Sequence, residues 1–213
     1  MTFKDKILMA VPKGRIMTQL ITVFDRIGLV PEQDFFNEKS RKMVFATNFP
    51  DLNLIKVRSF DIANFVKLGA CDIGVCGSDV FDEFKTDQLL EIFDLGIGKC
   101  KLCMAVEEGY EYDLSKISHA RVVTKYTNLT SQFFAGFGVQ AEIIKLNGAI
   151  EIATKLGLCN FIVDLVDTGY TMKENGMVVS EVICDVSSRL IANKSAFKVK
   201  NSKINSIIEL FNV

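Results

Sequence analysis

Acidic and hydroxyl side chains are concentrated in one stretch, residues 160–172, which reads NFIVDLVDTGYTM. Asp164 lies within an apolar run and Asp167 directly follows it, and Thr168 and Thr171 come next. Carboxylates can hold the hydroxyl groups of a sugar, directly or through Mg²⁺. Hydroxyl groups and backbone N–H groups in a tight loop can hold a phosphate group. The stretch therefore predicts a site for a phosphorylated sugar.

The elements around this stretch must present it as a loop. The apolar run Phe161–Val166 is typical of a buried strand in a parallel sheet. Residues 172–175 are expected to form the first turns of a helix that ends at Gly176. Residues 167–171 then connect strand to helix, where backbone N–H groups favour phosphate and Gly169 allows a close backbone approach. The alternative is an ordinary strand–turn–helix in which Asp and Thr only cap the helix.

Cationic residues follow two other predicted strands. Lys13-Gly14-Arg15 comes after a strand at 7–11 and before an amphipathic helix. Arg58 comes directly after a strand at 54–57, and Ser59 is expected to cap the helix that follows. Such cations suit the phosphate groups of a nucleotide. Solvated cationic loops without a ligand are the alternative.

Two further acids stand where helices are expected to begin. Glu151 falls early in a helix predicted over 149–156, and Asp79 follows Gly77 at the start of another. By themselves, both are ordinary acids of a first helical turn, where the helix dipole favours negative charge.

Several segments together resemble one enzyme family. The apolar strand, the acid and the TGxT loop resemble the phosphoribosyl-pyrophosphate loop of phosphoribosyltransferases. The chain is similar, in the same order from about Val11 to about Asn193, to the catalytic chain of ATP phosphoribosyltransferase in its short form. The segments that carry the resemblance are VPKGRI (11–16), VRSFDIANFVKLGACDIGVCGSDVFDE (57–83), DLGIGKCKLCMAV (94–106), LNGAIEIATKLGL (146–158), VDLVDTGYTMKENG (163–176) and SSRLIAN (187–193).

The resemblance implies a reaction and roles for residues. The adenine N1 of ATP attacks C1 of phosphoribosyl pyrophosphate, which gives phosphoribosyl-ATP and pyrophosphate in the first step of histidine biosynthesis. Glu151 and Asp164 would hold the ribose hydroxyls or Mg²⁺. Lys13 and Arg58 would act in catalysis by neutralising the phosphates. The remaining binding residues implied are Asp167, Thr168, Gly169, Tyr170 and Thr171 for phosphoribosyl pyrophosphate, and Lys13, Gly14, Arg15 and Asp79 for ATP. Tyr170 replaces the arginine usual in the family, which removes one cation from the phosphate loop.

The order of elements predicts an α/β fold. Strands alternate with helices, which favours mostly parallel sheets, and a polar break near residue 107 suggests two lobes. The resemblance implies two α/β lobes with a cleft between them, as in type II periplasmic binding proteins. Residues 1–99 with 185–213 would form lobe I, on the ATP and pyrophosphate side. Residues 100–184 would form lobe II, with the phosphoribosyl-pyrophosphate loop.

Composition bounds the class of protein. The 213 residues carry a net charge of −1, which gives no basic field for nucleic acid. The first residues contain an apolar run too short for a signal peptide, and no run is long enough to cross a membrane, so we expect a cytoplasmic chain. The six cysteines are then expected to be reduced and packed in the core. Cys100 and Cys103 face opposite sides of a predicted strand, which argues against a zinc site.

Two other functions are compatible with parts of this sequence. A non-catalytic solute- or nucleotide-binding protein of the same fold needs no TGxT loop, and a periplasmic one needs a signal peptide. A phosphoribosyltransferase for another base is opposed by the KGR and LNGAIE segments. The resemblance to the short form also implies a homo-oligomer, at least a dimer, and a separate regulatory subunit that resembles histidyl-tRNA synthetase.

Overall fold

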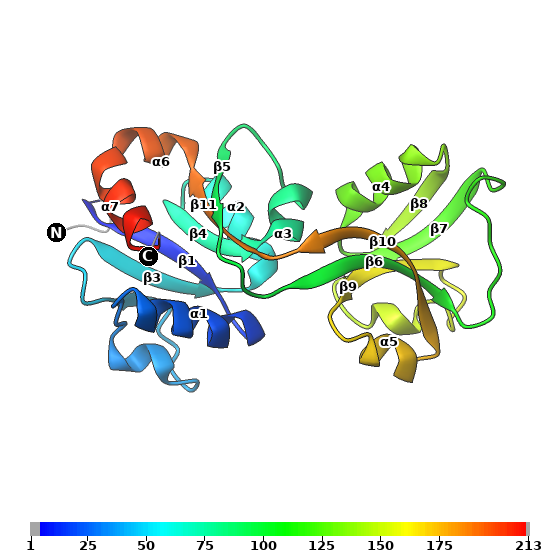
Figure 1. Cartoon of the computed structure of the whole chain (residues 1–213), viewed down its shortest axis with the longest axis horizontal. Helices are drawn as coiled ribbons and strands as arrows, with labels where there is room; N and C mark the ends of the chain where they lie inside the picture. The colour runs from blue at the N-terminus through cyan, green and yellow to red at the C-terminus, as the bar shows by residue number, and fades with distance from the viewer. Residues whose placement is uncertain (1–4, 212–213) are drawn as a thin grey trace. The chain divides into compact units, whose positions relative to one another are not determined.

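The computed structural model describes residues 5–211. The chain folds into two compact units, one formed by Met1–Gly98 with Ser187–Val213 and the other by Lys99–Val186. Each unit contains one mixed β-sheet with helices packed on it (Figure 1). The chain therefore leaves the first unit after residue 98 and returns to complete it from residue 187.

The first unit is built on a six-stranded sheet of order β2-β3-β1-β4-β11-β5. Strand β1 runs parallel to β3 and β4, whereas β2 and β11 run antiparallel to their neighbours. Its strands are β1 (Ile7–Pro12), β2 (Val44–Ala46), β3 (Leu52–Val57), β4 (Ile73–Gly77), β5 (Leu89–Asp94) and β11 (Ser188–Asn193). Its helices are α1 (Arg15–Arg26), α2 (Ile62–Lys67), α3 (Ser78–Glu83), α6 (Lys194–Val199) and α7 (Asn201–Phe211), with 3₁₀ turns η2 (Gln33–Phe36) and η3 (Ser59–Asp61).

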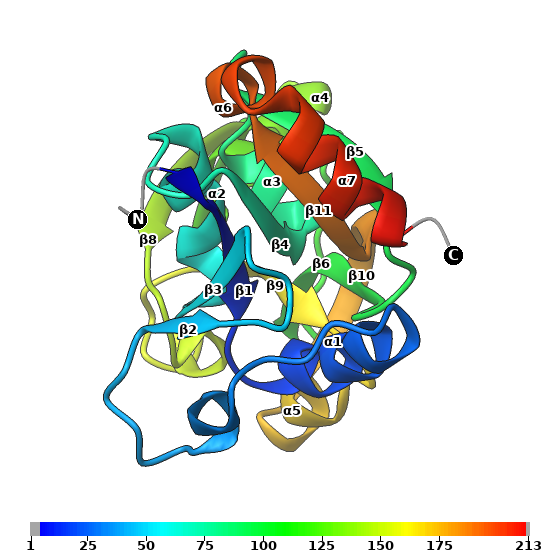
Figure 2. The ribbon, with the colours of Figure 1, turned by 90° about the vertical axis from the view of Figure 1, so that its left-hand side faces the viewer.

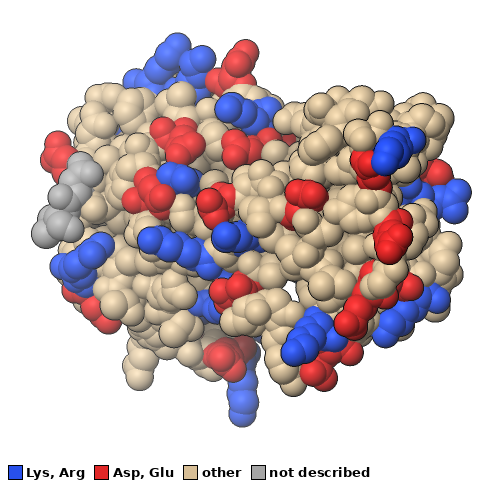
Figure 3. Space-filling model, turned by 45° about the vertical axis from the view of Figure 1, so that its right-hand side comes forward, with Lys and Arg blue, Asp and Glu red and all other residues tan. Residues whose placement is uncertain are grey.

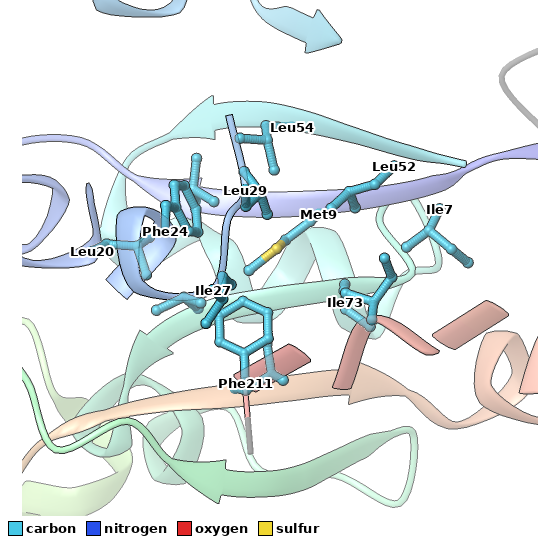
Figure 4. Packing of buried hydrophobic residues seen from close by; sticks show 14 of the residues in the cluster. Ile7, Met9, Leu20, Phe24, Ile27, Leu29, Leu52, Leu54, Ile73 and Phe211 are labelled. Atoms are coloured by element: carbon cyan, nitrogen blue, oxygen red, sulfur yellow. The ribbon is translucent and has the colours of Figure 1, made fainter. Parts of the chain in front are cut away.

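Alternation along the strands divides the core of this unit between two faces. Met9 packs in a cluster with side chains of α1 and α7, and its neighbour Ala10 packs in another with side chains of α2 and α3. Leu190 and Ile191 of β11 divide in the same way, as period-two geometry requires. Figure 2 shows α2 and α7 on opposite sides of β1 and β4, and Figure 4 shows the cluster around Met9 with Phe211.

The second unit is built on a five-stranded sheet of order β10-β6-β9-β7-β8. Strand β7 runs parallel to β8 and β9, and β6 runs antiparallel to β9 and β10. Its strands are β6 (Cys100–Glu107), β7 (His119–Thr124), β8 (Gln140–Lys145), β9 (Phe161–Val166) and β10 (Met177–Val186). Its helices are α4 (Thr127–Gly136) and α5 (Tyr170–Glu174), with the 3₁₀ turn η4 (Ile150–Ile152).

The α/β class is confirmed, but the expected type of sheet and three local expectations are wrong. Both sheets are mixed rather than mostly parallel. The helix expected over 149–156 is only the 3₁₀ turn η4, because Ala149 adopts a left-handed φ of 53° and turns follow residue 152. Ser59 does not cap a helix but lies inside η3. Helix α5 begins at Tyr170, so Tyr170 and Thr171 belong to its first turn rather than to the loop.

Three further features concern the cysteines, the surface charge and the helices. Cys71, Cys76, Cys103 and Cys159 are buried, as expected of core cysteines, whereas Cys100 and Cys184 are only partly buried. Basic and acidic side chains are interspersed on the face that Figure 3 shows, so neither sign forms an extended field there. Across residues 5–211, no helix has the length and apolar character needed to span a membrane.

Candidate functional site

The loop between β9 and α5 lines a small cavity with Glu151. The cavity has a volume of about 170 Å³, and its walls are Glu151 and residues 165–172. Gly169 adopts a left-handed conformation with φ 76°, which lets the chain turn into α5. Thr168 Oγ1 accepts a hydrogen bond of 3.4 Å from the Tyr170 N–H inside this turn. The structure thus brings Glu151, Asp167, Thr168, Gly169, Tyr170 and Thr171 together.

Apolar packing holds Glu151 beside the loop. Its neighbours Ile150 and Ala153 are fully or almost fully buried and share one cluster with Ile162 of β9 and Met172 of α5. The turn that carries Glu151 and the helix that follows the loop are therefore anchored on the same face of the sheet. Glu151 is the middle residue of the 3₁₀ turn η4 rather than part of the expected helix, and it lines the cavity.

Asp164 is placed differently from the other acid residues. Its Oδ1 atom lies 3.1 Å from Lys125 Nζ and also accepts a hydrogen bond of 2.8 Å from the Leu165 N–H. Asp164 does not belong to the lining of the cavity that Glu151 and Asp167 share. In the described structure the Asp164 carboxylate thus pairs with Lys125, and its expected role beside Glu151 stays a prediction.

Lys125 was not anticipated from the sequence. Thr124 closes β7, and its buried hydroxyl donates to the Val163 carbonyl at 2.7 Å and accepts from the Tyr126 N–H at 2.9 Å. Thr124 also lies opposite Val163 in the parallel register, so the next residue along each strand is Lys125 and Asp164. Parallel strands end at a common edge, and a cation directly after β7 was the signal that could have found it.

The cationic loop of the first unit lines a second cavity. Lys13-Gly14-Arg15 borders a volume of about 500 Å³ whose other walls include Phe35, Phe45 and Lys56. Lys56 Nζ lies 4.1 Å from the ring centroid of Phe35 and 5.2 Å from that of Phe45. Burial, and then the charge of Lys13, hold the pKa of Lys56 below its usual value. Lys56 was not anticipated, since it falls inside a strand.

Arg58 and Asp79 lie in the same unit but outside the walls of this cavity. Arg58 is exposed just after β3, and the Lys13 N–H donates to the Val57 carbonyl at 3.1 Å, so both cations follow adjoining parallel strands. Asp79 is the second residue of α3 and only 3% exposed, so its carboxylate does not present an open surface to a ligand.

The candidate site offers carboxylates to a metal ion but no cluster of three protein ligands within the described residues. Within residues 5–211, no three His, Cys, Asp or Glu side chains cluster as metal ligands would. Glu151 and Asp167 supply two carboxylates to one cavity, which suits an Mg²⁺ ion that takes its other oxygens from substrate and water. A cavity of about 850 Å³ includes His119, Gln140 and Asn160 in its lining, at the amino ends of β7, β8 and β9. Since α/β sheets bind ligands beyond the carboxyl ends of their strands, we place the site at the smaller cavity.

Sequence comparison relates this chain to one enzyme family. Residues 58–212 match the model of the ATP phosphoribosyltransferase family. A protein from Sphingopyxis alaskensis named ATP phosphoribosyltransferase is 48% identical over 207 residues, which cover 97% of this chain and 93% of that protein. One of the same name from Rhizorhabdus wittichii is 49% identical over 208 residues, with 97% and 94% covered.

Solved structures extend the comparison to the fold. The ATP phosphoribosyl transferase (HisG:HisZ) complex from Thermotoga maritima contains a chain that is 27% identical, with a TM-score of 0.80 and coverage of 97% of this chain and 96% of that one. The alkanesulfonate-binding protein SsuA from Xanthomonas axonopodis pv. citri, bound to MOPS, has a TM-score of 0.55 at 10% identity and covers 98% of this chain and 72% of that one. The second likeness confirms the periplasmic-binding-protein type of fold alone. From its sequence and its fold together, the chain belongs to the ATP phosphoribosyltransferase family.

Proposed function

We propose that this chain transfers the 5-phosphoribosyl group from phosphoribosyl pyrophosphate to N1 of the adenine of ATP, the first step of histidine biosynthesis. The products are phosphoribosyl-ATP and pyrophosphate. The observation that carries the proposal is the cavity that Glu151 shares with Asp167, Thr168 and Thr171 beyond the carboxyl end of β9, in a chain of this family. Carboxylates beside a phosphate-binding turn suit a ribose 5-phosphate.

The reaction needs positioning and charge stabilisation rather than a protein nucleophile. The adenine ring nitrogen forms the new bond to C1 of the ribose, and the C1–oxygen bond to pyrophosphate breaks. Negative charge grows on the leaving pyrophosphate, where Lys13 and Arg58 would stabilise it. Residues Asp167–Thr171 would hold the 5-phosphate, while Glu151 and Asp164 would bind the ribose hydroxyls. At Tyr170 the loop lacks the cation that an arginine side chain would provide, and the Tyr170 N–H donates to Thr168 Oγ1 at 3.4 Å.

ATP would bind at the loop formed by Lys13, Gly14 and Arg15. Gly14 and Arg15 line the 500 Å³ cavity with Lys13, so this loop offers two cations and an open backbone to the triphosphate. Asp79 would act from its buried position in α3 rather than by direct contact with ATP.

Magnesium would arrive with the substrate. Mg²⁺ binds through one or two carboxylates together with substrate phosphate oxygens, rather than in an all-protein cage. Glu151 and Asp167 are the carboxylates that meet this description, and Asp164 becomes available when Lys125 moves away. When bound, the ion would neutralise charge on the diphosphate.

The likeness to a solved complex supports a proposal on assembly. The related Thermotoga maritima structure is a complex of HisG with HisZ. We propose that this chain likewise forms a homo-oligomer, at least a dimer, and assembles in the cytoplasm with a regulatory subunit that resembles histidyl-tRNA synthetase. Light scattering on the purified chain alone and mixed with that subunit measures both masses, and a monomer that does not change on mixing would contradict this part of the proposal.

The enzymatic proposal is tested by pyrophosphate release from ATP, Mg²⁺ and phosphoribosyl pyrophosphate. Asp164→Asn and Thr168→Val should lower the rate by a factor of about 100 or more, since each removes a group that orients the substrate. Matched controls are Asp113→Asn, whose carboxylate pairs with Lys116 at 2.8 Å on the surface, and Thr86→Val in an exposed turn. Near-normal rates in both site variants, with circular dichroism unchanged, would refute these assignments, and an inactive wild-type chain would refute the proposed function.

A further inference from the structure

Asp164, which is expected to bind the substrate, forms an ion pair with Lys125 in the described structure. Lys125 Nζ and Asp164 Oδ1 are 3.1 Å apart, and the two side chains are 26% and 17% exposed. At this degree of burial, solvent screens the attraction less than it does for a surface pair. In the described structure the Asp164 carboxylate is thus already neutralised by a neighbouring cation.

The backbone below the pair is firmly held. Thr124 is fully buried, and its two hydrogen bonds join the end of β7 to Val163 in β9 and to Tyr126 in the following turn. Tyr126 is only 1% exposed, so the residue on either side of Lys125 is fixed in the core. The lysine side chain itself is long and flexible, with an ammonium group that can redirect its three donors.

The position of Lys125 gives its ammonium group a second use. Asp164 is two residues before the end of β9, and the 165–172 segment that lines the 170 Å³ cavity begins immediately after it. When ribose hydroxyls or a substrate-bound cation engage the Asp164 carboxylate, the ammonium group loses its counter-ion. An unpaired, partly buried cation is costly, and the diphosphate of the same substrate supplies the replacement negative charge.

We propose that Lys125 exchanges its counter-ion during binding: it pairs with Asp164 in the free protein and with the diphosphate of phosphoribosyl pyrophosphate in the complex. This inference rests on the proposed function and adds a substrate-binding residue to it. Lys125 contributes no covalent step. The exchange leaves neither group without a partner, because the carboxylate and the ammonium group each acquire a new partner from the same substrate.

A simple structural ion pair predicts different behaviour, and inorganic pyrophosphate distinguishes the two. Its dissociation constant is measured by calorimetry, with chelator present to exclude metal ions, for wild type, Asp164→Asn, Lys125→Met and the double variant. Exchange predicts that Asp164→Asn binds pyrophosphate about five- to tenfold more tightly, since the ammonium group is released and charge-assisted contacts are strong. Lys125→Met should weaken binding about tenfold or more.

The double variant decides between exchange and mere loss of repulsion. If Asp164 only repels pyrophosphate, Asp164→Asn improves binding equally with and without Lys125. Under exchange, the gain disappears in the Lys125→Met background, so the two substitutions are coupled. Equal gains in both backgrounds, no effect of Lys125→Met, or no binding of pyrophosphate by wild type would each overturn the inference.

Control variants separate a local effect from a change of fold. Lys116→Met removes an exposed lysine that precedes β7, at the opposite end of the strand from Lys125, and should leave pyrophosphate affinity within about twofold because screening is strong at that distance. Lys125→Arg keeps the charge and should bind within about threefold of wild type. If Lys125→Met does not fold, Lys125→Gln takes its place. Turnover of wild type with ATP and phosphoribosyl pyrophosphate is measured separately, so an inactive enzyme and a failed coupling are distinct results.

Discussion

Replacing Thr124 with Val removes one hydroxyl group from beneath the candidate site and changes little else. Thr124 is fully buried, and its hydroxyl donates to the Val163 carbonyl at 2.7 Å and accepts from the Tyr126 N–H at 2.9 Å. Val163 is also fully buried and Tyr126 almost so. Valine fills nearly the same volume, so the substitution leaves a carbonyl and an N–H without their partner where water does not easily reach them.

The expected cost follows from these two groups. Each buried polar group that loses its partner costs about 1–3 kcal/mol, so Thr124→Val should lower the free energy of unfolding by about 2–6 kcal/mol. Thr124→Ser keeps the hydroxyl and loses one buried methyl group, which should cost only about 1 kcal/mol. The difference between the two variants isolates the hydrogen bonds from the packing.

Urea unfolding followed by far-ultraviolet circular dichroism measures this difference. The midpoint for Thr124→Val should fall well below that for Thr124→Ser, with the slope against urea unchanged. If Thr124→Val proves as stable as Thr124→Ser, the hydroxyl does not fasten β7 to β9, and the argument that it positions Lys125 fails with it.

Three other perturbations test separate parts of the structure. Gly74→Ala should destabilise the first unit by about 1–3 kcal/mol in urea, because the added Cβ would lie 2.8 Å from Ile62 Cγ2, whereas Gly136→Ala has no atom within 4 Å and serves as the control. Burial raises the pKa of Asp82, so the contribution of this residue to stability is present in acid and is lost as the pH rises through the folded-state pKa. Asp82→Asn should therefore be more stable than wild type at neutral pH and should lose this advantage in acid. Thermal unfolding at both pH values measures the difference. Arg58→Ala should lower kcat with little change in KM, since the cation meets charge that develops on pyrophosphate, and a rise in KM alone would make Arg58 a binding group instead.

The strands and the turn that follows β9 could be predicted because their signals are local. The apolar run Phe161–Val166 predicted β9 with the bounds that the structure has. Gly169 and Gly176 marked the turn and the end of α5, and both adopt positive φ. Such signals depend on residues close in sequence, where side-chain type and backbone conformation are directly linked.

Strand pairing could not be predicted in the same way. Strand β9 is as apolar as a strand of a parallel sheet, yet it runs parallel to β7 and antiparallel to β6. Burial on both faces produces the apolar run, and burial is independent of the direction of the neighbour. The helix expected at 149–156 was wrong because an apolar pattern reports burial and not the length of the element. Ile150 and Ala153 do pack inward, but a 3₁₀ turn is enough to bury them.

The state of Asp164 depends on contacts that no local pattern contains. A carboxylate within a strand that is largely buried requires a partner, because burial without one is costly. The sequence shows that Asp164 requires a partner but does not identify Lys125. Lys125 directly follows β7, where the Thr124 hydroxyl donates to the Val163 carbonyl 39 residues later in the chain. Lys125 satisfies the carboxylate in the described structure and so allows an acid to be kept ready at the carboxyl end of β9. Because Lys125 compensates its charge, the Asp164 carboxylate can stay ionised in the folded protein without a ligand. Under the proposed exchange, the binding of substrate frees this carboxylate from Lys125.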